Sequence, residues 1–253
     1  MTTTNTLIEC ITLLQQHRPV DALKIIRPLI DTNPDDATVW TIYGEVLVNN
    51  DLYLAGLEAW IEADSRTPQP IDIIKKMAQI ARKLGRTKDA LQYFCRCIEL
   101  HPTAENIEAS GNFLLEIGQL KDAEQLLTIA SSTGNLRAVA GLIDLRVRQN
   151  RRPEAADLVT QHLPRISEEP ALIQACARLM LAEKEHNSAL EVLGMIDINR
   201  LSPESKLVHF RLLGETLDKL GKHAQAFNAY TQFNRMRGCT YNSDQHHVRL
   251  NSV

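Results

Sequence analysis

Residues 37–70 read ATVWTIYGEVLVNNDLYLAGLEAWIEADSRTPQP, and this stretch contains the pattern that decides the fold. Apolar residues recur through it at spacings of three and four, which predicts amphipathic α-helices. Gly44 and Gly56 are small residues within the two apolar stripes, and Pro68 ends the second stripe. The stretch therefore predicts two antiparallel helices, neither of which can bury its apolar face alone.

A small residue recurs along the whole chain at intervals of 32 to 37 residues. It is found at Ala22, Gly56, Ala90, Ala123, Ala155, Ala189 and Ala226. A period of about 34 is typical of repeats that each consist of one helix pair. No sustained alternation of period two is present, so no strands are expected. The period predicts an all-α helical-repeat array.

The residues that accompany this period resemble the tetratricopeptide repeat family over nearly the whole chain. They are Trp40, Tyr43, Gly44 and Leu47 in the second repeat, Ala78, Gly85, Ala90, Phe94 and Pro102 in the third, Gly111, Gly118, Ala123 and Ala130 in the fourth, and Phe210, Gly214, Gly221, Ala226 and Tyr230 in the seventh. The resemblance implies an all-α tetratricopeptide-type solenoid, a right-handed superhelix of about seven helix pairs. Repeats five and six have lost the most consensus residues and are expected to be the weak zone.

The period divides the chain into one predicted array over residues 3–237 and a tail or linker over residues 238–253. The predicted repeats are 3–36, 37–70, 71–103, 104–135, 136–169, 170–204 and 205–237. Glycines are expected where the two helices of a pair approach closely, at Gly44, Gly111 and Gly214. Others are expected in the turn after the first helix, at Gly85, Gly118 and Gly221. Pro34, Pro68 and Pro102 are expected to stop second helices.

Composition and charge exclude several classes of protein. The net charge of −3 gives no reason to expect nucleic acid or an acidic membrane as a partner. No targeting signal and no apolar run of membrane-spanning length is found, so a cytoplasmic location is the default expectation. The five cysteines do not predict a disulfide framework, and Cys10, Cys97 and Cys176 are expected to be buried as small apolar residues.

Motifs of catalysis are not found in the sequence. It has no phosphate-binding Gly-x4-Gly-Lys loop, no dinucleotide fingerprint, no His-Glu-x-x-His and no Gly-x-Ser-x-Gly. The acidic pairs Asp35–Asp36 and Glu168–Glu169 fall at repeat junctions, where they favour helix starts. His246 and His247 are interpreted as solvated tail residues. We therefore expect no enzyme activity, no cofactor and no metal.

The last repeat carries a second resemblance, to bacterial proteins that join a tetratricopeptide array to a sulfotransferase domain. The run from Phe210 to Tyr230 continues into residues 232–237. In those proteins a basic stretch and a short linker follow the last helix, and the residues here that resemble them are Asn234, Arg235, Arg237, Tyr241 and Asp244. The resemblance implies a catalytic domain further along in such proteins. Nothing like its phosphate-binding loop occurs in this chain, so no catalytic residue is transferred.

The first helix of each pair is expected to line a concave groove. Its outward polar residues predict a candidate binding surface of Lys75, Gln79, Arg82, Asn112, Arg137 and Arg148. The basic members are suited to carboxylates of a peptide. The alternative is an ordinary solvated face, because Glu45, Glu108 and Asp144 are interleaved with them. A chaperone-tail clamp is not predicted, since its positions hold Leu7, Ile11, Ile42, Asp72 and Lys76, and only Lys76 fits.

Three functions remain open. The chain is predicted to be a scaffold that binds a protein or peptide through the concave groove or the convex face. The alternatives are the regulatory or substrate-presenting half of a sulfotransferase-like protein, and a self-associating structural element. Self-association is expected through the C-terminal edge, where the last pair presents Leu213, Leu217, Phe227, Tyr230 and Phe233.

Overall fold

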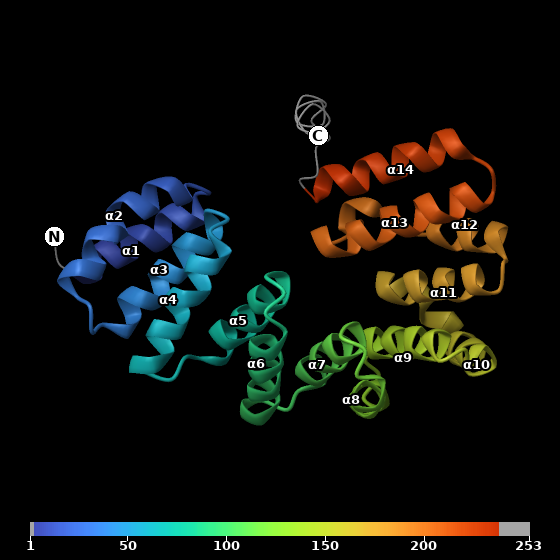
Figure 1. The fold of residues 1–253 in the computed structure, drawn as a ribbon, viewed down its shortest axis with the longest axis horizontal. Coiled ribbons are helices and arrows are strands. Elements are labelled where there is room, and N and C mark those ends of the chain that lie inside the picture. Colours follow the sequence, from blue (N-terminus) through green and yellow to red (C-terminus); the bar gives the residue numbers. More distant parts are fainter. Residues whose placement is uncertain (1–2, 238–253) are drawn as a thin grey trace, which may run out of the picture. The chain divides into compact units, whose positions relative to one another are not determined.

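The computed structural model describes residues 3–237, which form fourteen α-helices, two short 3-10 helices and no strand. These residues divide into two compact units, one ending at Ile117 and the other beginning at Gly118. Unit 1 contains α1 (Thr3–Gln15), α2 (Pro19–Thr32), α3 (Ala37–Asn49), α4 (Tyr53–Arg66), α5 (Ile71–Lys83), α6 (Thr87–Leu100) and α7 (Ala104–Glu116) (Figure 1). Unit 2 contains α8 (Leu120–Ser132), α9 (Leu136–Arg148), α10 (Arg152–His162), η1 (Leu163–Glu168), α11 (Pro170–Ala182), α12 (His186–Gly194), η2 (Ile198–Arg200), α13 (Pro203–Lys219) and α14 (His223–Met236).

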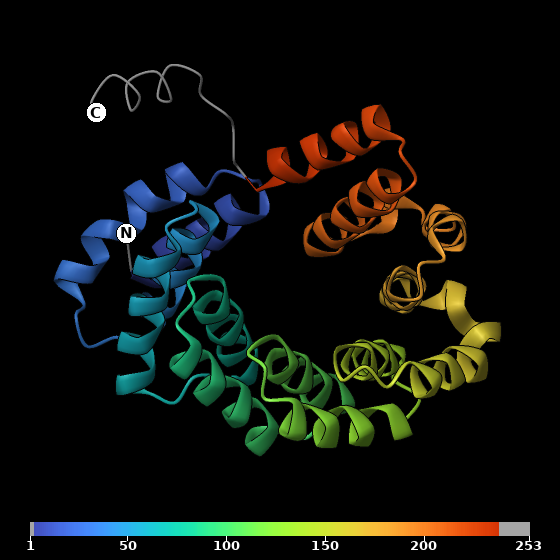
Figure 2. The same ribbon diagram turned by 45° about the vertical axis from the view of Figure 1, so that its right-hand side comes forward.

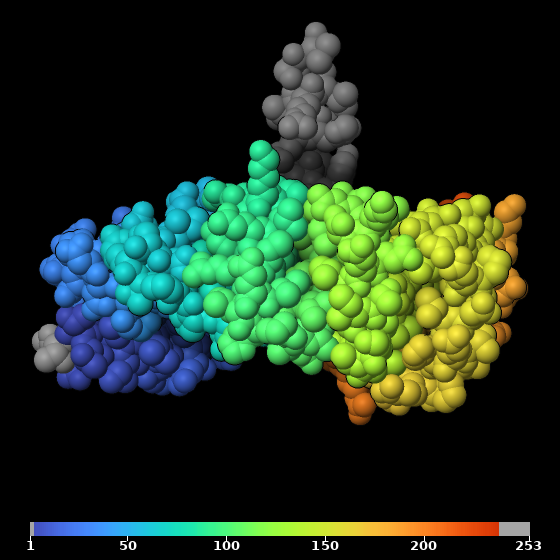
Figure 3. All heavy atoms as spheres, turned by 90° about the horizontal axis from the view of Figure 1, so that it is seen from below, coloured from blue at the N-terminus to red at the C-terminus, as the bar shows by residue number. Residues whose placement is uncertain are grey.

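Consecutive helices form antiparallel pairs within each unit. The pairs α1–α2, α3–α4 and α5–α6 pack together in unit 1, and α9–α10, α11–α12 and α13–α14 do so in unit 2 (Figure 2). Neighbouring pairs of a unit lie against one another at the surface (Figure 3). The predicted all-α class and the number of helix pairs are confirmed in residues 3–237. The single array predicted over these residues stays a prediction, because the structure divides them into two compact units.

The turn between the two helices of each repeat contains one residue with a left-handed backbone. Gly85, Gly118 and Gly221 have φ of 71°, 82° and 71°, which confirms the predicted turn glycines. The other four repeats place a residue with a side chain in this conformation, namely His17, Asp51, Asn150 and Lys184. In six of the turns the next backbone N–H donates to a carbonyl five residues earlier, as in Arg86 to Ala81 at 2.9 Å. This is the helix-ending motif that requires a left-handed residue.

The two helices of a pair come so close that a side chain is excluded from one of them. A Cβ atom on Gly44 of α3 would lie 2.4 Å from Trp60 Cδ1 of α4. A Cβ atom on Gly214 of α13 would lie 2.7 Å from Tyr230 Cε1 of α14. Trp60 is fully buried, and its indole N–H donates to the Thr41 carbonyl at 3.1 Å. The predicted close approach is therefore confirmed at Gly44 and Gly214.

The helix ends follow the local sequence signals. The Asp36 side chain caps α3 by accepting from the Thr38 N–H at 2.8 Å, and Glu169 caps α11 by accepting from Ala171 N–H at 3.1 Å. Pro34, Pro68 and Pro102 each come two residues after the end of a second helix. α13 begins at Pro203, two residues before the boundary predicted for the seventh repeat, because Ser202 caps it.

Repeats five and six differ from the others in their second helices. α10 has 11 residues and α12 has 9, whereas the first helices α9 and α11 keep the 13 residues of α1, α3, α5 and α7. A 3-10 segment follows each short helix. The first helices form much of the core of unit 2, through buried residues such as Ile143 and Leu172. The structural change that accompanies the loss of consensus residues in repeats five and six is therefore in the second helices, α10 and α12.

The cysteines behave as apolar residues where they are buried. Cys10, Cys97 and Cys176 are buried, as predicted, while Cys95 is exposed. Burial raises the pKa of the Cys10 thiol and of the Cys176 thiol to about 11. Both thiols therefore stay protonated near neutral pH. Cys239 lies outside the described residues.

The turn residues lead to a matched set of stability predictions. Lys184→Gly should stabilise unit 2 by about 0.5–1 kcal/mol, because glycine adopts positive φ without a Cβ clash. Gly85→Ala should destabilise unit 1 by about 1 kcal/mol, and the cause is backbone strain alone, since open space surrounds the added Cβ. Thermal unfolding followed by circular dichroism measures both changes.

The control for this pair is Gly194→Ala. Gly194 also has open space around its added Cβ, but its φ is not positive. The substitution should leave the melting temperature unchanged or raise it slightly. Equal losses from Gly85→Ala and Gly194→Ala would contradict the role assigned to the left-handed turn.

The short second helices lead to a prediction for hydrogen exchange. Amides of α10 and α12 should exchange faster than those of α9 and α11, because local opening of a short helix breaks fewer apolar contacts. Native-state exchange followed by mass spectrometry resolves these segments. Equal protection of the four helices would show that the loss of consensus residues does not weaken repeats five and six.

Candidate functional site

The six residues of the predicted binding surface lie on three first helices. Lys75, Gln79 and Arg82 follow one face of α5, at a spacing of four and then three residues. Asn112 lies on α7, and these four residues belong to unit 1. Arg137 and Arg148 lie near opposite ends of α9 in unit 2, about 16 Å apart along the helix axis. The six are therefore not brought together in one described site.

Several of these polar side chains already hold partners in the next repeat. Arg82 Nε lies 2.6 Å from Glu116 of α7, and Arg137 Nε lies 3.0 Å from Glu169, the residue that caps α11. Asn112 donates to Glu108 on its own helix at 2.5 Å. The predicted surface is thus largely engaged within the chain.

The same kind of pairing links other first helices. Lys76 of α5 lies 2.5 Å from Glu45 of α3. Arg178 of α11 binds both oxygens of Asp144 of α9, at 2.6 and 2.5 Å. We call these four pairs, Glu45–Lys76, Arg82–Glu116, Arg137–Glu169 and Asp144–Arg178, the first-helix ladder. Arg82–Glu116 is exposed and contributes at most about 1 kcal/mol, whereas Asp144–Arg178 is partly buried, with 19% and 25% of its side chains exposed. The pairs help to fix the register of neighbouring repeats.

An apolar hollow opens between α1 and α3 of unit 1. Its volume is about 480 Å³, and its lining residues are Ile11, Leu14, Gln15, Thr41, Ile42, Glu45 and Asn49. Three aliphatic side chains are accompanied by the two amide side chains and by Glu45, which already pairs with Lys76. Ile11 is 43% exposed, which is high for an isoleucine. Such an apolar concavity with a few polar groups is typical of a binding site.

Two residues that line the hollow, Ile11 and Ile42, fall at positions of a chaperone-tail clamp. They do not provide the charged or amide groups of a clamp. In the structure they line the hollow instead, while Leu7 of the same set is buried in the core. The sequence signal that could have revealed the hollow was the presence of apolar residues on the outward face of a first helix. This signal was missed because helical periodicity alone assigns apolar residues to the core.

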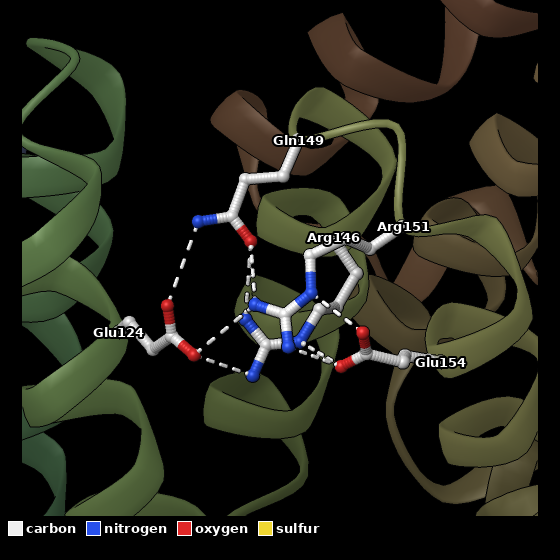
Figure 4. Close-up of polar contacts among 5 residues, drawn as sticks. All are labelled: Glu124, Arg146, Gln149, Arg151 and Glu154. Atoms are coloured by element: carbon white, nitrogen blue, oxygen red, sulfur yellow. Dashed lines mark hydrogen bonds and ion pairs between the residues drawn. The ribbon is translucent and has the colours of Figure 1, made fainter.

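A second polar cluster joins three helices of unit 2 (Figure 4). Arg146, near the end of α9, lies 2.7 Å from Glu124 of α8 and 3.2 Å from Glu154 of α10. Arg151, in the turn before α10, binds Glu154 through Nε at 2.6 Å. The side-chain oxygen of Gln149, Oε1, accepts from both arginines, at 3.3 and 3.1 Å. Figure 4 shows both guanidinium groups between the two carboxylates.

This cluster is balanced in charge, because two arginines face two glutamates. The hydrogen bond from Arg146 lowers the pKa of Glu124, and the hydrogen bond from Arg151 lowers the pKa of Glu154. Only 13% of the Arg146 side chain is exposed. The cluster therefore acts as a structural tie between α8, α9 and α10, and not as a site that awaits a ligand.

Between residues 3 and 237 no three His, Cys, Asp or Glu side chains are grouped so that they could hold a metal ion. Among the helices described here, none is both long and apolar enough to cross a membrane.

Comparison with known proteins identifies the type of fold. A family profile for the tetratricopeptide repeat matches residues 76–103, which include part of α5 and all of α6. No curated protein sequence matches the chain. The structural likeness covers far more of the chain than this one repeat.

Three solved structures illustrate this likeness. A tetratricopeptide repeat protein from Parabacteroides merdae superposes with a TM-score of 0.77 at 14% identity, over 95% of this chain and 94% of that one. YrrB, described as a tetratricopeptide protein with an unusual peptide-binding site, has a TM-score of 0.56 at 17% identity, over 74% and 89%. Yeast Tom70 has a TM-score of 0.63 at 14% identity, over 87% and 48%. The fold is therefore a tetratricopeptide-type helical repeat.

The cluster of Figure 4 leads to a prediction on acid stability. The pKa of Glu124 lies below its ordinary value of 4.5 in the folded chain, so the stabilisation is present above about pH 4.5 and is lost as the pH falls through the folded pKa. Arg146→Met should destabilise unit 2 by about 1–2 kcal/mol at pH 7, and this loss should become smaller as the pH is lowered from 4.5 to 3. Urea unfolding at pH 7 and pH 3 measures this difference.

The matched control is Arg165→Met. Arg165 pairs with Glu168 on η1, and the two side chains are 48% and 53% exposed. Its loss should change the stability by less than about 0.5 kcal/mol at either pH. An Arg146→Met variant that is destabilised equally at pH 7 and pH 3 would show that packing of the side chain, and not its charge, matters.

Proposed function

We propose that this tetratricopeptide-type chain is a protein-interaction scaffold that binds a peptide segment of a partner protein on the first helices of unit 1. The observation that carries the proposal is the apolar hollow between α1 and α3. One apolar side chain of the peptide enters the hollow, and the peptide backbone lies along its rim. The proposal agrees with the fold, since repeat arrays use the surfaces of stacked helices for binding. YrrB, which has a similar fold, is described as having a peptide-binding site.

The dimensions of the hollow suit this role. A volume of about 480 Å³ lies within the range of small binding pockets, and it accommodates one large aliphatic or aromatic side chain. Ile11, Leu14 and Ile42 provide the apolar contacts. Gln15 and Asn49 have amide groups that both donate and accept, which suits the N–H and C=O groups of a peptide.

The charges near the hollow indicate the kind of peptide. Glu45 is paired with Lys76, so the hollow does not require a charged ligand. The peptide is therefore expected to be anchored by an apolar residue, with an affinity that depends only weakly on salt. An acidic peptide held by Lys75, Arg82, Arg137 and Arg148 is the other form of this function. It is less favoured, because Arg82 and Arg137 would first have to leave Glu116 and Glu169.

The sulfotransferase-associated role stays a prediction from the last repeat alone. The chain matches a tetratricopeptide profile and is similar to tetratricopeptide structures. Tyr241 and Asp244, which belong to the linker resemblance, lie outside the described residues. No observation on residues 3–237 favours that role over a scaffold.

Selection from a phage-displayed random peptide library against the full chain tests the proposal. Selected peptides should share an aliphatic or aromatic residue. Ile11→Asp should reduce their affinity about tenfold or more, because a carboxylate replaces part of the apolar lining. The variant should fold, since Ile11 is 43% exposed.

The control is Ile8→Asp on the same helix. Ile8 is 57% exposed and does not line the hollow, so the selected peptides should bind this variant within about twofold of the parent chain. If Ile8→Asp and Ile11→Asp have equal effects, the hollow is not the site. If the selected peptides are acidic and lose affinity in Lys75→Glu or Arg82→Glu, the basic face of α5 is the site instead.

A further inference from the structure

The imidazole of His209, on α13, is buried while one of its nitrogens has no hydrogen-bond partner. Only 3% of this residue is exposed. Its Nδ1 atom finds no partner among the described residues. Buried polar groups are normally hydrogen-bonded, and histidine is the side chain whose charge ordinarily changes near neutral pH. His209 is therefore a buried group of unit 2 that a change of pH can affect.

His209 occupies a position at which first helices contact the repeat before them. It lies 17 residues before Ala226, the small residue of its repeat, and the same spacing identifies Val39 in α3 and Leu172 in α11. Val39 and Leu172 are fully buried. Val39 shares a core cluster with Ile26 of α2, the second helix of the preceding repeat. Since α13 packs on α12 in the same way, His209 is placed at the contact between repeats six and seven.

The apolar residues at this contact belong to the core of unit 2. Leu212, one turn after His209 on the same face of α13, is 1% exposed. It shares a core cluster with Leu193 of α12 and with Ile196, which follows that helix. These aliphatic side chains offer no hydrogen bond to an imidazole.

Two leucines predicted to be exposed at the C-terminal edge also belong to the interior of this repeat. Leu217 of α13 is only 5% exposed, and Leu213 packs against the core of unit 2. The prediction that both residues form an exposed edge is therefore wrong. The helix that contains His209 is buried on more than one side, because α11, α12 and α14 all pack on it.

The buried polar side chains nearest to His209 along the helix faces are already engaged. The Thr216 hydroxyl, two turns after His209, donates to the Leu212 carbonyl at 2.7 Å. The Gln174 amide of α11 donates to the carbonyl of Ser205, one turn before His209, at 2.9 Å. Both contacts satisfy the polar group concerned and leave the imidazole without one.

Repeat four has a polar residue at the same position, and there it has partners. The side-chain amide of Asn106 donates to the His101 carbonyl at 2.7 Å and to the Cys97 carbonyl at 3.4 Å. Cys97 lies in the last turn of α6, whereas α12 ends at Gly194, two residues before the equivalent Ile196. The shorter α12 lacks the helical turn that supplies these acceptors, which accounts for the unpartnered Nδ1 of His209.

No charged group compensates for the burial of His209. Burial lowers its pKa below the ordinary value of 6.5, and no other group contributes to the shift. On α13 itself, Lys206 lies one turn before His209. The ionisable residues of the helices packed on α13 are Cys176 and Arg178 of α11, His186 and Glu191 of α12, and His223, Tyr230 and Arg235 of α14. None of them therefore offsets the cost of a positive charge at His209.

We infer that the contact between α12 and α13 is an acid-sensitive joint, which holds repeat seven while His209 is neutral and releases α13 and α14 when His209 takes up a proton. The proton adds a second N–H donor and a positive charge to a ring that has no acceptor for Nδ1. Opening of the joint transfers this charge to water. The joint belongs to unit 2 alone and does not depend on the α1–α3 hollow.

The direction of the effect follows from the difference between the closed and the open form. The pKa of His209 is lowered in the closed form and returns towards 6.5 when the ring is exposed, so acid favours the open form below about pH 6.5 and has no effect well above it. Between pH 7 and pH 5 the ratio of open to closed molecules should rise by up to about twentyfold. Ordinary carboxylates titrate below this range.

Native-state hydrogen exchange of the full chain at pH 7 and pH 5, followed by mass spectrometry, tests the inference. Each rate is divided by the intrinsic rate of the unfolded sequence at the same pH. Protection of α13 and α14 should fall by up to about twentyfold at pH 5, while that of α9 should change by less than about threefold. His209→Leu, which introduces the residue that α11 has at this position, should keep the protection of α13 and α14 equal at the two pH values.

The matched control is His223→Gln in the same repeat. The His223 side chain is 75% exposed, so this variant should lose protection at pH 5 as the parent chain does. An NMR titration of the imidazole signals in the unmodified chain gives a second measurement that does not require a variant to fold. The midpoint for His209 should lie below 6.5.

Three results would overturn the inference. One is a midpoint for His209 at or above 6.5. Another is a loss of protection at pH 5 that is as large in His209→Leu as in the parent chain. The third is a loss that is equal in α9 and α13, which would show a general effect of acid on unit 2 and not the opening of one joint.

Discussion

The close approach of the two helices in each pair is the constraint on which the rest of the structure depends. A Cβ on Gly44 would penetrate the Trp60 ring, at 2.4 Å, so the spacing of α3 and α4 requires glycine there. Gly56 faces the other way with the same result, since its Cβ would lie 2.5 Å from Val48 Cγ2. Once α3 and α4 have this spacing, the Trp60 side chain fills the remaining space between them. The next repeat then packs on this pair. The register of the ladder pairs and the depth of the α1–α3 hollow both follow from that stacking.

Most of the fold could be predicted because its determinants are local and periodic. The small residues, the turn glycines and the prolines that follow second helices each act within a few residues of their position. His17, Asp51 and Asn150 belong to residue types that are enriched at positive φ, but this preference is much weaker than that of glycine, and Lys184 has no such preference. The helix-ending hydrogen bonds impose the conformation at these four positions, which the sequence analysis did not identify. The shortening of α10 and α12 was also not predicted. The loss of consensus residues indicated that repeats five and six are less stable, but not that their second helices are shorter.

The candidate site was less predictable, because it depends on which side chains meet across repeats. Arg82 lies exposed on α5, and its partner Glu116 lies 34 residues further along the chain. Pairing at about one repeat length is visible in a sequence only when acids and bases are compared across the period. The hollow was missed for a different reason. Ile11 and Ile42 continue an apolar helical pattern, and only the packing of α1 on α3 shows which of the apolar residues remain accessible.

The placement of Trp60 beneath Gly44 has an optical consequence. The chain has two tryptophans, Trp40 and Trp60, and both belong to the second repeat. Trp60 is fully buried in unit 1, while Trp40 is partly exposed and bonded to the Pro34 carbonyl. Indole emission therefore reports on the α3–α4 pair, and unit 2 contributes no indole signal. Helical ellipticity, in contrast, averages over both units. The chain thus carries a natural local probe for the α3–α4 pair and a global probe for all of its helices.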